Sequence, residues 1–260
     1  AIIKEELTEI KERYGEDRRT EIQAVGTTFS VEDMIAEEET VLTFTYKGYL
    51  KRTAAATYRS QRRGGRGLQG AKAKEEDFVE HLFVANTHDY ILFFTDKGKC
   101  HWLKVHEIPP GGRAARGRAI VNLLGTEPGE KVKAFVSVKT FDEEKFIVMA
   151  TRKGIIKKTK LSAYGKPRKG GIYAIDIREG DELIEAKITN GENDIVLGTR
   201  EGKSIRFPET DARPMGRKTR GVIGIKLSKK NDYVVGMVVV RREGTLLVAT
   251  EKGFGKRTEV

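Results

Sequence analysis

An apolar strand pattern that ends in a tight turn occurs five times along this 260-residue chain. The copies occupy residues 41–53, 91–103, 147–159, 195–207 and 246–258. In each copy an apolar, mostly β-branched run leads to a threonine, then after two residues to a glycine, then to a second run. Glycine supplies the positive φ that a tight turn needs. The pattern therefore predicts five β-hairpins.

The segments between the hairpins repeat as well. Each contains a basic, glycine-bearing loop, an apolar strand, an acidic or Gly/Asn turn and another apolar strand, as in residues 172–177 and 183–189 after the third hairpin. Periods of about 40 to 50 residues with four strands are typical of propeller blades. We therefore expect an all-β fold with propeller-like, four-stranded blades, whose repeats begin near residues 41, 91, 147, 195 and 246.

Residues 1–22 follow a different period. Ile3, Leu7, Ile10 and Tyr14 are spaced by four, three and four residues, which predicts one apolar face on an otherwise charged helix. We expect this face to pack on protein outside the chain. Residues 23–40 indicate an acidic linker, and residues 41–260 the β domain.

Positive charge is concentrated in the β domain. The chain carries a formal charge of +11, but its first 40 residues hold 5 basic and 12 acidic side chains, so the rest carries +18. Such a balance predicts attraction to polyanions, although it says nothing about the fold.

Four basic loops lie at nearly the same phase of their repeats, at residues 59–67, 111–118, 165–171 and 213–221. The distance from hairpin glycine to loop glycine is 19 residues in three repeats, and 16 in the third, from Gly154 to Gly170. Equivalent loops on equivalent blades would form one continuous arc. Arginine and exposed backbone N–H groups match phosphate oxygens, so the arc predicts a phosphate-binding rim.

The rim predicts backbone contacts rather than base readout, because no element suited to a groove carries the basic residues. We expect non-sequence-specific binding and bending of duplex DNA. Aromatic platforms for single strands are scarce. Lysines and arginines on the second hairpin strands are expected to widen the rim: Lys51, Arg52, Lys104, Lys157, Lys158, Arg206, Lys256 and Arg257. The candidate DNA-binding residues are Arg59, Gln61, Arg62, Arg63, Gly64, Gly65, Arg66, Gly67, Arg113, Arg116, Arg118, Lys166, Arg168, Lys169, Arg213, Arg217, Lys218 and Arg220.

Other chemistry is poorly supported by the sequence. No P-loop, HExxH or nucleophile-elbow motif is present, and the single Cys100 excludes an internal disulfide. Cys100, His101 and His106 lack the paired spacing of a zinc site, and Trp102 is expected to pack between blades. We expect no catalytic, cofactor or metal site, and a cytoplasmic protein without a membrane span.

Residues 58–67, together with residues 33–35 and 48–52, resemble the start of the C-terminal domain of the DNA gyrase A subunit. Residues 61–67 (QRRGGRG) look like the gyrase box, with Arg66 where many relatives have lysine. The resemblance covers the whole chain, and residues 2–22 look like the end of the helical arm and the exit strand of the cleavage core.

The resemblance implies a β-pinwheel that wraps duplex DNA, so that ATP-driven strand passage introduces negative supercoils. It implies a non-catalytic part of a bacterial, nucleoid-associated topoisomerase. Its partners would be DNA, the cleavage core of the same polypeptide and the gyrase B subunit, while ATP and Mg²⁺ would bind elsewhere in the holoenzyme. Arg13-Tyr14 matches the dipeptide that carries the topoisomerase nucleophile, but Tyr14 completes the apolar helix face. The family usually has six blades, of which five begin here. The alternatives are a topoisomerase IV pinwheel or a propeller scaffold for protein partners.

Overall fold

The computed structural model describes residues 2–20, 31–58, 77–229 and 231–260, which form two units, residues 1–35 and 36–260. The first unit contains the helix α1 (Ile2–Tyr14) and the short 3₁₀ turn η1 (Val31–Met34). The predicted helix is confirmed. Its apolar side chains Ile3, Leu7, Ile10 and Tyr14 are all more than half exposed, so the surface on which they would pack stays a prediction. Residues 21–30 of the expected linker lie outside the described residues.

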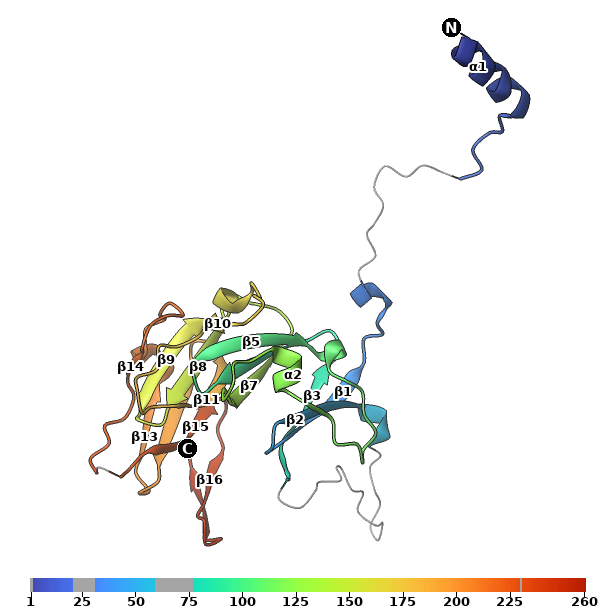
Figure 1. Cartoon of the computed structure of the whole chain (residues 1–260). Coiled ribbons are helices and arrows are strands. Elements are labelled where there is room, and N and C mark those ends of the chain that lie inside the picture. Colours follow the sequence, from blue (N-terminus) through green and yellow to red (C-terminus); the bar gives the residue numbers. More distant parts are fainter. Residues whose placement is uncertain (1, 21–30, 59–76, 230) are drawn as a thin grey trace. The chain divides into compact units, whose positions relative to one another are not determined.

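The second unit consists almost entirely of antiparallel strands (Figure 1). The strands are β1 (Glu39–Thr45), β2 (Tyr49–Ala54), β3 (Val79–Asn86), β4 (Tyr90–Thr95), β5 (Lys99–Lys104), β6 (Arg118–Ala119), β7 (Val132–Val138), β8 (Phe146–Thr151), β9 (Ile155–Lys160), β10 (Ile172–Tyr173), β11 (Leu183–Thr189), β12 (Asp194–Thr199), β13 (Ser204–Pro208), β14 (Val222–Ile223), β15 (Val234–Val240), β16 (Thr245–Ala249) and β17 (Gly255–Glu259). Short helical turns connect them: η2 (Ala55–Thr57), η3 (Val105–Glu107), α2 (Val121–Leu124), η4 (Leu161–Tyr164) and η5 (Glu209–Asp211).

The strands form five sheets, here called blades 1 to 5, and all five predicted hairpins are present. Their strand orders are β3-β1-β2-β6, β7-β4-β5-β10, β11-β8-β9-β14, β15-β12-β13 and β16-β17. The first three blades have four strands each, and the expected propeller-like architecture of four-stranded blades is confirmed.

The fourth strand of each complete blade comes from the following repeat. β6 follows the second hairpin but pairs with β2 of the first, β10 pairs with β5, and β14 pairs with β9. The sequence pattern predicts that these segments are longer strands of the blades formed by their own repeats. Both the blade and the length are wrong. Each is only two residues long, because only those two residues pair with the neighbouring blade.

The blades are arranged radially. The strands β7, β11 and β15 form the inner edges of blades 2 to 4. They pack beside one another at the hub. The exchanged strands β6, β10 and β14 stand at the opposite edge of their sheets, and this edge is the rim. The three hydrophobic clusters lie between neighbouring blades. One joins blades 1 and 2, the next joins blades 2 and 3, and the last joins blades 3 and 4.

Trp102 shows how the blades are held together. Its ring packs against the cluster between blades 2 and 3, and its Nε1 donates a hydrogen bond to the carbonyl of Tyr164, 2.8 Å away. The predicted position between blades is confirmed. The apolar side chains of the blade 5 hairpin are much less buried than those of the other blades, since Leu247, Val248 and Phe254 are each more than half exposed.

The hairpin turns explain the repeated threonine and glycine. In all five copies the threonine Oγ1 accepts a hydrogen bond from the backbone N–H four residues later, and its carbonyl accepts one from the turn glycine. The five glycines have φ between 74° and 86°. In blades 1, 3 and 4 an aspartate also accepts the N–H of the residue before the glycine; these are Asp77, Asp181 and Asp232.

A second set of glycines makes the strand exchange possible. Gly117, Gly171 and Gly221 all have positive φ, and a Cβ on any of them would lie 2.4 to 2.9 Å from a carbonyl oxygen of the preceding blade's second hairpin strand. Gly171, rather than Gly170, is thus the equivalent residue in the third repeat, because Gly170 makes no such approach. A bulkier residue here would push the loop away from the neighbouring blade.

Gly221→Ala is therefore expected to lower the free energy of unfolding by about 2 kcal/mol or more, since it combines a left-handed backbone with a backbone clash. Gly216→Ala in the same loop is the control, because nothing lies within 4 Å of its Cβ position and its φ is not in the left-handed region. Urea unfolding of the two variants measures the difference. Equal stability would contradict the role given to Gly221.

Candidate nucleic-acid interface

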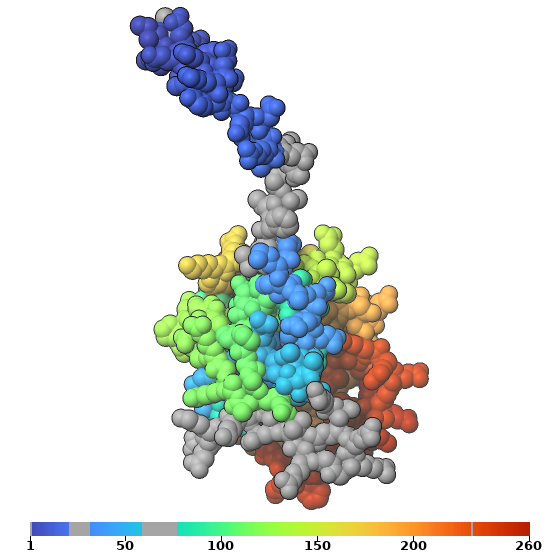
Figure 2. All heavy atoms as spheres, turned by 90° about the vertical axis from the view of Figure 1, so that its right-hand side faces the viewer, coloured from blue at the N-terminus to red at the C-terminus, as the bar shows by residue number. Residues whose placement is uncertain are grey.

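The loop of the second repeat runs along the outer edge of blade 1. The Arg52 N–H donates to the Pro109 carbonyl at 3.2 Å, and the Gly111 N–H donates to the Arg52 carbonyl at 2.9 Å. The Thr53 hydroxyl donates to the Gly111 carbonyl. Figure 2 shows the green segment after β5 lying against the blue and cyan residues of blade 1. The basic loop thus belongs in space to the preceding blade.

The loop of the fourth repeat has the same relation to blade 3. Pro214 forms a bridge with Lys158, and the Met215 N–H donates to the Lys158 carbonyl at 2.8 Å. In blade 1 the corresponding bridge joins Pro110 and Arg52. Two loops about a hundred residues apart are therefore fastened to equivalent strands in the same register.

The loop of the third repeat runs from η4 to β10 on the edge of blade 2. A Cβ on Gly171 would lie within 3 Å of the Cys100 carbonyl oxygen and the His101 ring. The N–H of Gly171 donates to the Arg168 carbonyl at 3.0 Å. All three loops end at a two-residue strand on the outer edge of a successive blade. The regular spacing predicts that the loops form one arc, and the three described loops follow the outer edges of blades 1 to 3.

Most of the candidate cations in these loops are exposed. Arg116, Arg118, Lys166, Arg168, Lys169, Arg213, Lys218 and Arg220 are exposed, whereas Arg113 and Arg217 are half-buried. One of them has a carboxylate partner, since Arg220 Nε donates to Asp176 at 2.8 Å. The Arg116 guanidinium lies 3.7 Å from the centre of the Tyr49 ring, a cation–π contact.

Residues 59–67 lie outside the described residues, so Arg59 and the segment Gln61, Arg62, Arg63, Gly64, Gly65, Arg66 and Gly67 remain sequence predictions. The placement on a preceding blade is therefore described for loops 111–118, 165–171 and 213–221, and not for this first loop.

Three lysines expected on the rim are buried instead. Lys51, Lys157 and Lys158 are 2%, 0% and 3% exposed, so they do not widen a surface stripe. The Lys158 ammonium lies 2.9 Å from Glu209 Oε2, and this carboxylate also accepts the Thr189 hydroxyl. Lys158 therefore fastens blade 3 to the turn after β13.

Lys51 binds two backbone carbonyls of the next repeat's loop, whereas Lys157 binds one carbonyl of that loop and one of its own repeat, at Ala174 just after β10. Lys51 Nζ donates to the carbonyls of Gly112 and Arg113, at 3.1 and 2.5 Å, and Lys157 Nζ donates to those of Ala174 and Arg217. Sequence reasoning missed this role because a lysine in a strand is usually exposed. No local pattern signals it, because consecutive residues on both faces of these strands are buried.

The remaining second-strand cations vary. Arg52 Nε donates to the Ile108 carbonyl, Lys104 lies over the Tyr90 ring, and Arg206 pairs with Asp194 at 2.7 Å. Lys256 and Arg257 are exposed in β17. Exposed positive charge on the outer edges thus comes mainly from the loops.

The cysteine and histidine considered as metal ligands are in the core of blade 2. Cys100 is fully buried, and burial raises the pKa of its thiol well above the usual range. His101 lies 3.4 Å from Glu130, which also accepts the Thr95 hydroxyl at 2.6 Å. Within residues 2–20, 31–58, 77–229 and 231–260, no three side chains are grouped to hold a metal ion. Nor does any helix there have the length and apolar character to span a membrane.

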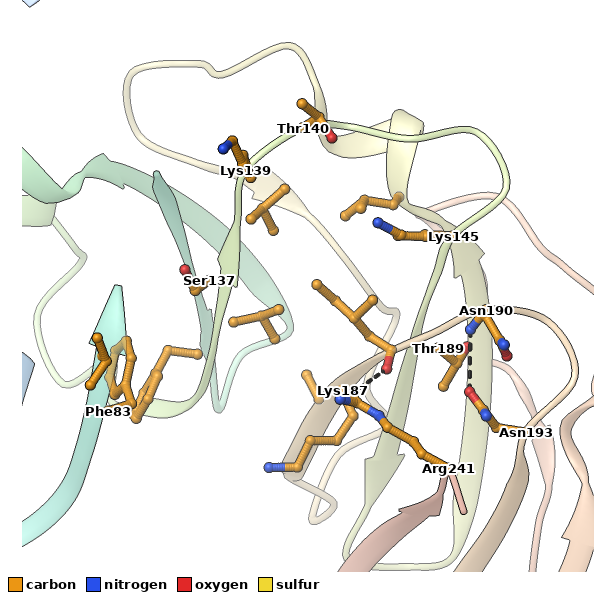
Figure 3. Close-up of a pocket in the computed structure, with 17 residues that line it drawn as sticks. Phe83, Ser137, Lys139, Thr140, Lys145, Lys187, Thr189, Asn190, Asn193 and Arg241 are labelled. Atoms are coloured by element: carbon orange, nitrogen blue, oxygen red, sulfur yellow. Dashed lines mark hydrogen bonds between the residues drawn. The ribbon is translucent and has the colours of Figure 1, made fainter. Parts of the chain in front are cut away.

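A separate cavity of about 770 Å³ lies at the hub, between the strands β7 and β11. Figure 3 shows Phe83 on one side and Lys187, Asn190, Asn193 and Arg241 on the other. Lys139, Lys145 and Lys187 line it too, each close to a carboxylate, namely Glu37, Asp142 and Glu185. Cations therefore occur at the hub as well as at the rim, but these three hub lysines are paired.

Lys157 is expected to make stability depend on pH. Burial and the nearby Arg217 lower its pKa from 10.5 to about 7. Between about pH 7 and 10 the unfolded chain holds a proton that the folded chain lacks, so the free energy of unfolding gains a contribution that rises with pH. Below pH 7 both states are protonated and this contribution is lost.

The measurement is the difference in unfolding free energy between the parent chain and Lys157→Met, from urea titrations between pH 6 and 10. The difference should shift in favour of the parent as pH rises. Lys160→Met removes an exposed lysine from the same strand and should give a nearly constant difference. A constant difference for Lys157→Met would refute the assignment.

Comparisons with known proteins agree with this geometry. The family model described as DNA gyrase C-terminal domain, beta-propeller, matches residues 39–86, 89–139, 145–190, 193–241 and 244–260, which are the five repeats. The DNA gyrase A subunit of Clostridium acetobutylicum is 52% identical over 86% of the chain and 27% of its own length. That of Haemophilus influenzae is 43% identical over the whole chain and 32% of its own length. The chain thus spans about a third or less of these relatives.

Two solved structures share the fold. A DNA gyrase A C-terminal domain superposes with a TM-score of 0.69 at 26% identity, covering 85% of this chain and 71% of its own. The C-terminal domain of a DNA topoisomerase IV superposes with a TM-score of 0.71 at 29% identity, covering 87% and 69%. With the family model matching most of its residues, the chain belongs to the family of DNA gyrase A C-terminal domains, which are β-propellers of the pinwheel type.

Proposed function

We propose that this domain binds duplex DNA without sequence preference and bends it around the rim of the blades. The observation that carries the proposal is the repeated placement of a basic loop on the outer strand of successive blades, in loops 111–118, 165–171 and 213–221. Guanidinium and ammonium groups bind phosphates without reading bases. A curved row of such loops favours a bent duplex over a straight one.

The energetics are consistent with bending. Smooth bending of about 20 to 30 base pairs costs roughly 1 to 6 kcal/mol, which phosphate contacts along the arc must offset. The exposed cations of the three described loops are spread over three blades rather than gathered in one patch. They are therefore suited to successive phosphates along a curved path.

Within a complete gyrase, such bending would present one DNA segment to another, and ATP-driven strand passage would then introduce negative supercoils. The similarity to DNA gyrase A subunits supports this role. On this proposal the domain itself is non-catalytic. At the nucleoid it works with the cleavage core and with the gyrase B subunit, and ATP and Mg²⁺ bind in those other parts.

A role in topoisomerase IV is the second candidate, favoured by the superposition on that enzyme's C-terminal domain. The predicted box at residues 61–67 favours gyrase. A propeller that serves only as a scaffold for protein partners would bind DNA weakly and with little dependence on salt.

Replacing three rim cations should weaken DNA binding more than replacing three hub cations. The triple variant Lys166→Ala, Arg168→Ala and Lys169→Ala should bind a 30-base-pair duplex roughly 10 to 100 times more weakly. The slope of log affinity against log salt should fall in magnitude by up to about 3, or 0.9 per lost phosphate contact.

The matched control, Lys139→Ala, Lys145→Ala and Lys187→Ala, removes the same charge from the hub cavity. Fluorescence titrations across a salt series compare the two. If the hub variant loses as much affinity and slope as the rim variant, the rim is not the binding path.

Replacing residues 61–67 by alanines in the full-length protein, reconstituted with the gyrase B subunit, should abolish negative supercoiling while ATP-independent relaxation persists. The reason is that only the direction of passage depends on wrapping in this proposal. Plasmid topology gels measure both activities. Retained supercoiling would remove this loop from the mechanism and favour the topoisomerase IV role.

A further inference from the structure

We infer that Lys51 and Lys157 are positioning residues that fix the backbone of the following repeat's basic loop, and through it the affinity of the rim for DNA. This inference rests on the proposed function for its effect on DNA, whereas the anchoring itself is independent of it. Neither lysine is placed to touch DNA, since both are buried.

The two lysines occupy equivalent positions. Each is three residues after the hairpin glycine, Gly48 or Gly154, and each lies in the second strand of its hairpin. One carbonyl that each lysine binds is equivalent too, whereas the second differs, being that of Gly112 for Lys51 and that of Ala174 for Lys157. Arg113 is four residues before the closing glycine of its loop and Arg217 is four residues before that of its own. The same contact therefore forms twice, on blades 1 and 3, from different sequences.

The anchored loop carbonyls, of Gly112, Arg113 and Arg217, lie between the two places where the sheet holds each loop. Near its start the loop is held by the parallel bridges of Pro110 and Pro214, and at its end by β6 or β14. Between these points the backbone leaves the sheet edge. Lys51 Nζ donates to two loop carbonyls and Lys157 Nζ to one, so each amine supplies an attachment that the strand ladder does not.

Blade 2 provides a natural contrast. The equivalent residue there is His101, which is directed at Glu130. The loop above it is also two residues shorter, since Gly154 and Gly171 are 17 residues apart, whereas Gly98 and Gly117, like Gly202 and Gly221, are 19 apart. The longer loops thus lie over a lysine and the shorter loop over a histidine, as expected if the two extra residues need an anchor.

The anchored residue in each long loop is itself an arginine, half-buried and followed by exposed cations such as Arg116, Lys218 and Arg220. Holding the carbonyl of Arg113 or Arg217 restricts where these cations project. A loop that is ordered before binding does not lose that conformational entropy when DNA arrives. Removing the anchor should therefore weaken binding without removing any charge that contacts phosphate.

The test uses Lys157→Met in the 260-residue chain, because methionine keeps most of the length and apolar stem but has no donor. Tryptic cleavage after Arg217, Lys218 and Arg220, followed by mass spectrometry, should accelerate at least about fivefold, since local opening exposes the backbone. Cleavage after Arg113 and Arg116 is the internal reference, because Lys51 still anchors that loop. A purely structural defect would accelerate cleavage at both loops alike and would contradict the inference.

DNA binding is measured on the same samples with a 30-base-pair duplex across a salt series. Lys157→Met should lower affinity about 3- to 10-fold with a nearly unchanged salt slope, because the cations that contact phosphate are all retained. Lys160→Met, which replaces an exposed lysine of the same strand by the same residue, should leave cleavage of the 213–221 loop unchanged. Unchanged cleavage in Lys157→Met, or faster cleavage with unchanged DNA affinity, would overturn the inference.

Two further arms keep the outcomes separate. If Lys157→Met fails to fold by circular dichroism, Lys51→Met tests the same relation on loop 111–118, with loop 213–221 as the reference. If the parent chain itself shows no salt-dependent affinity for DNA, the proposed function fails, while the cleavage ratio still decides whether the lysines anchor their loops.

Discussion

The strand that each blade receives from the next repeat is the interaction on which the rest of the structure depends. Because β6, β10 and β14 leave their own repeat and pair with the preceding blade, the loop just before each strand is drawn across that blade's outer edge. The exchange is possible only where the chain approaches a backbone carbonyl without a side chain in between, as at Gly117 and Gly221. One local constraint thus determines both the connection between blades and the position of the basic loops.

This arrangement makes neighbouring blades energetically dependent on each other. The hydrophobic clusters lie between blades rather than within them, and the exchanged strand adds backbone hydrogen bonds across the same boundary. Stability should then be a sum of nearest-neighbour terms, as in other repeat proteins. The buried pair of Lys158 and Glu209 adds a polar contact to one such boundary. Such a pair fixes the geometry of two groups more than it adds stability.

The sequence was sufficient for the hairpins, because Thr151 and Gly154, like their equivalents, are needed for one turn geometry and recur at a clear period. It was insufficient for the strand exchange, since a two-residue strand such as β10 has no period of its own and its partner is about 70 residues earlier in the chain.

For the candidate site, the sequence was sufficient for the exposed loop cations and insufficient for the buried lysines. Loop cations such as Arg168 are exposed as expected. Lys51 and Lys157 were misplaced because their burial depends on carbonyls of another repeat, which no local pattern contains. The equivalence of Gly171 rather than Gly170 was missed for the same reason, because only contact with the neighbouring strand distinguishes two adjacent glycines.

The distribution of carboxylates completes the argument for a charged rim. A basic loop next to an acidic turn would normally be neutralised, and the repeats do contain such turns. In blades 1, 3 and 4, however, Asp77, Asp181 and Asp232 accept backbone N–H groups of the hairpin turns. These carboxylates are held at the turns by backbone donors rather than by the loop cations. Among the cations of loops 111–118, 165–171 and 213–221, the three that the structure describes, Arg220 is the one paired with a carboxylate, that of Asp176. Hairpin stability and the proposed affinity for a polyanion are thus compatible, because they use different donors.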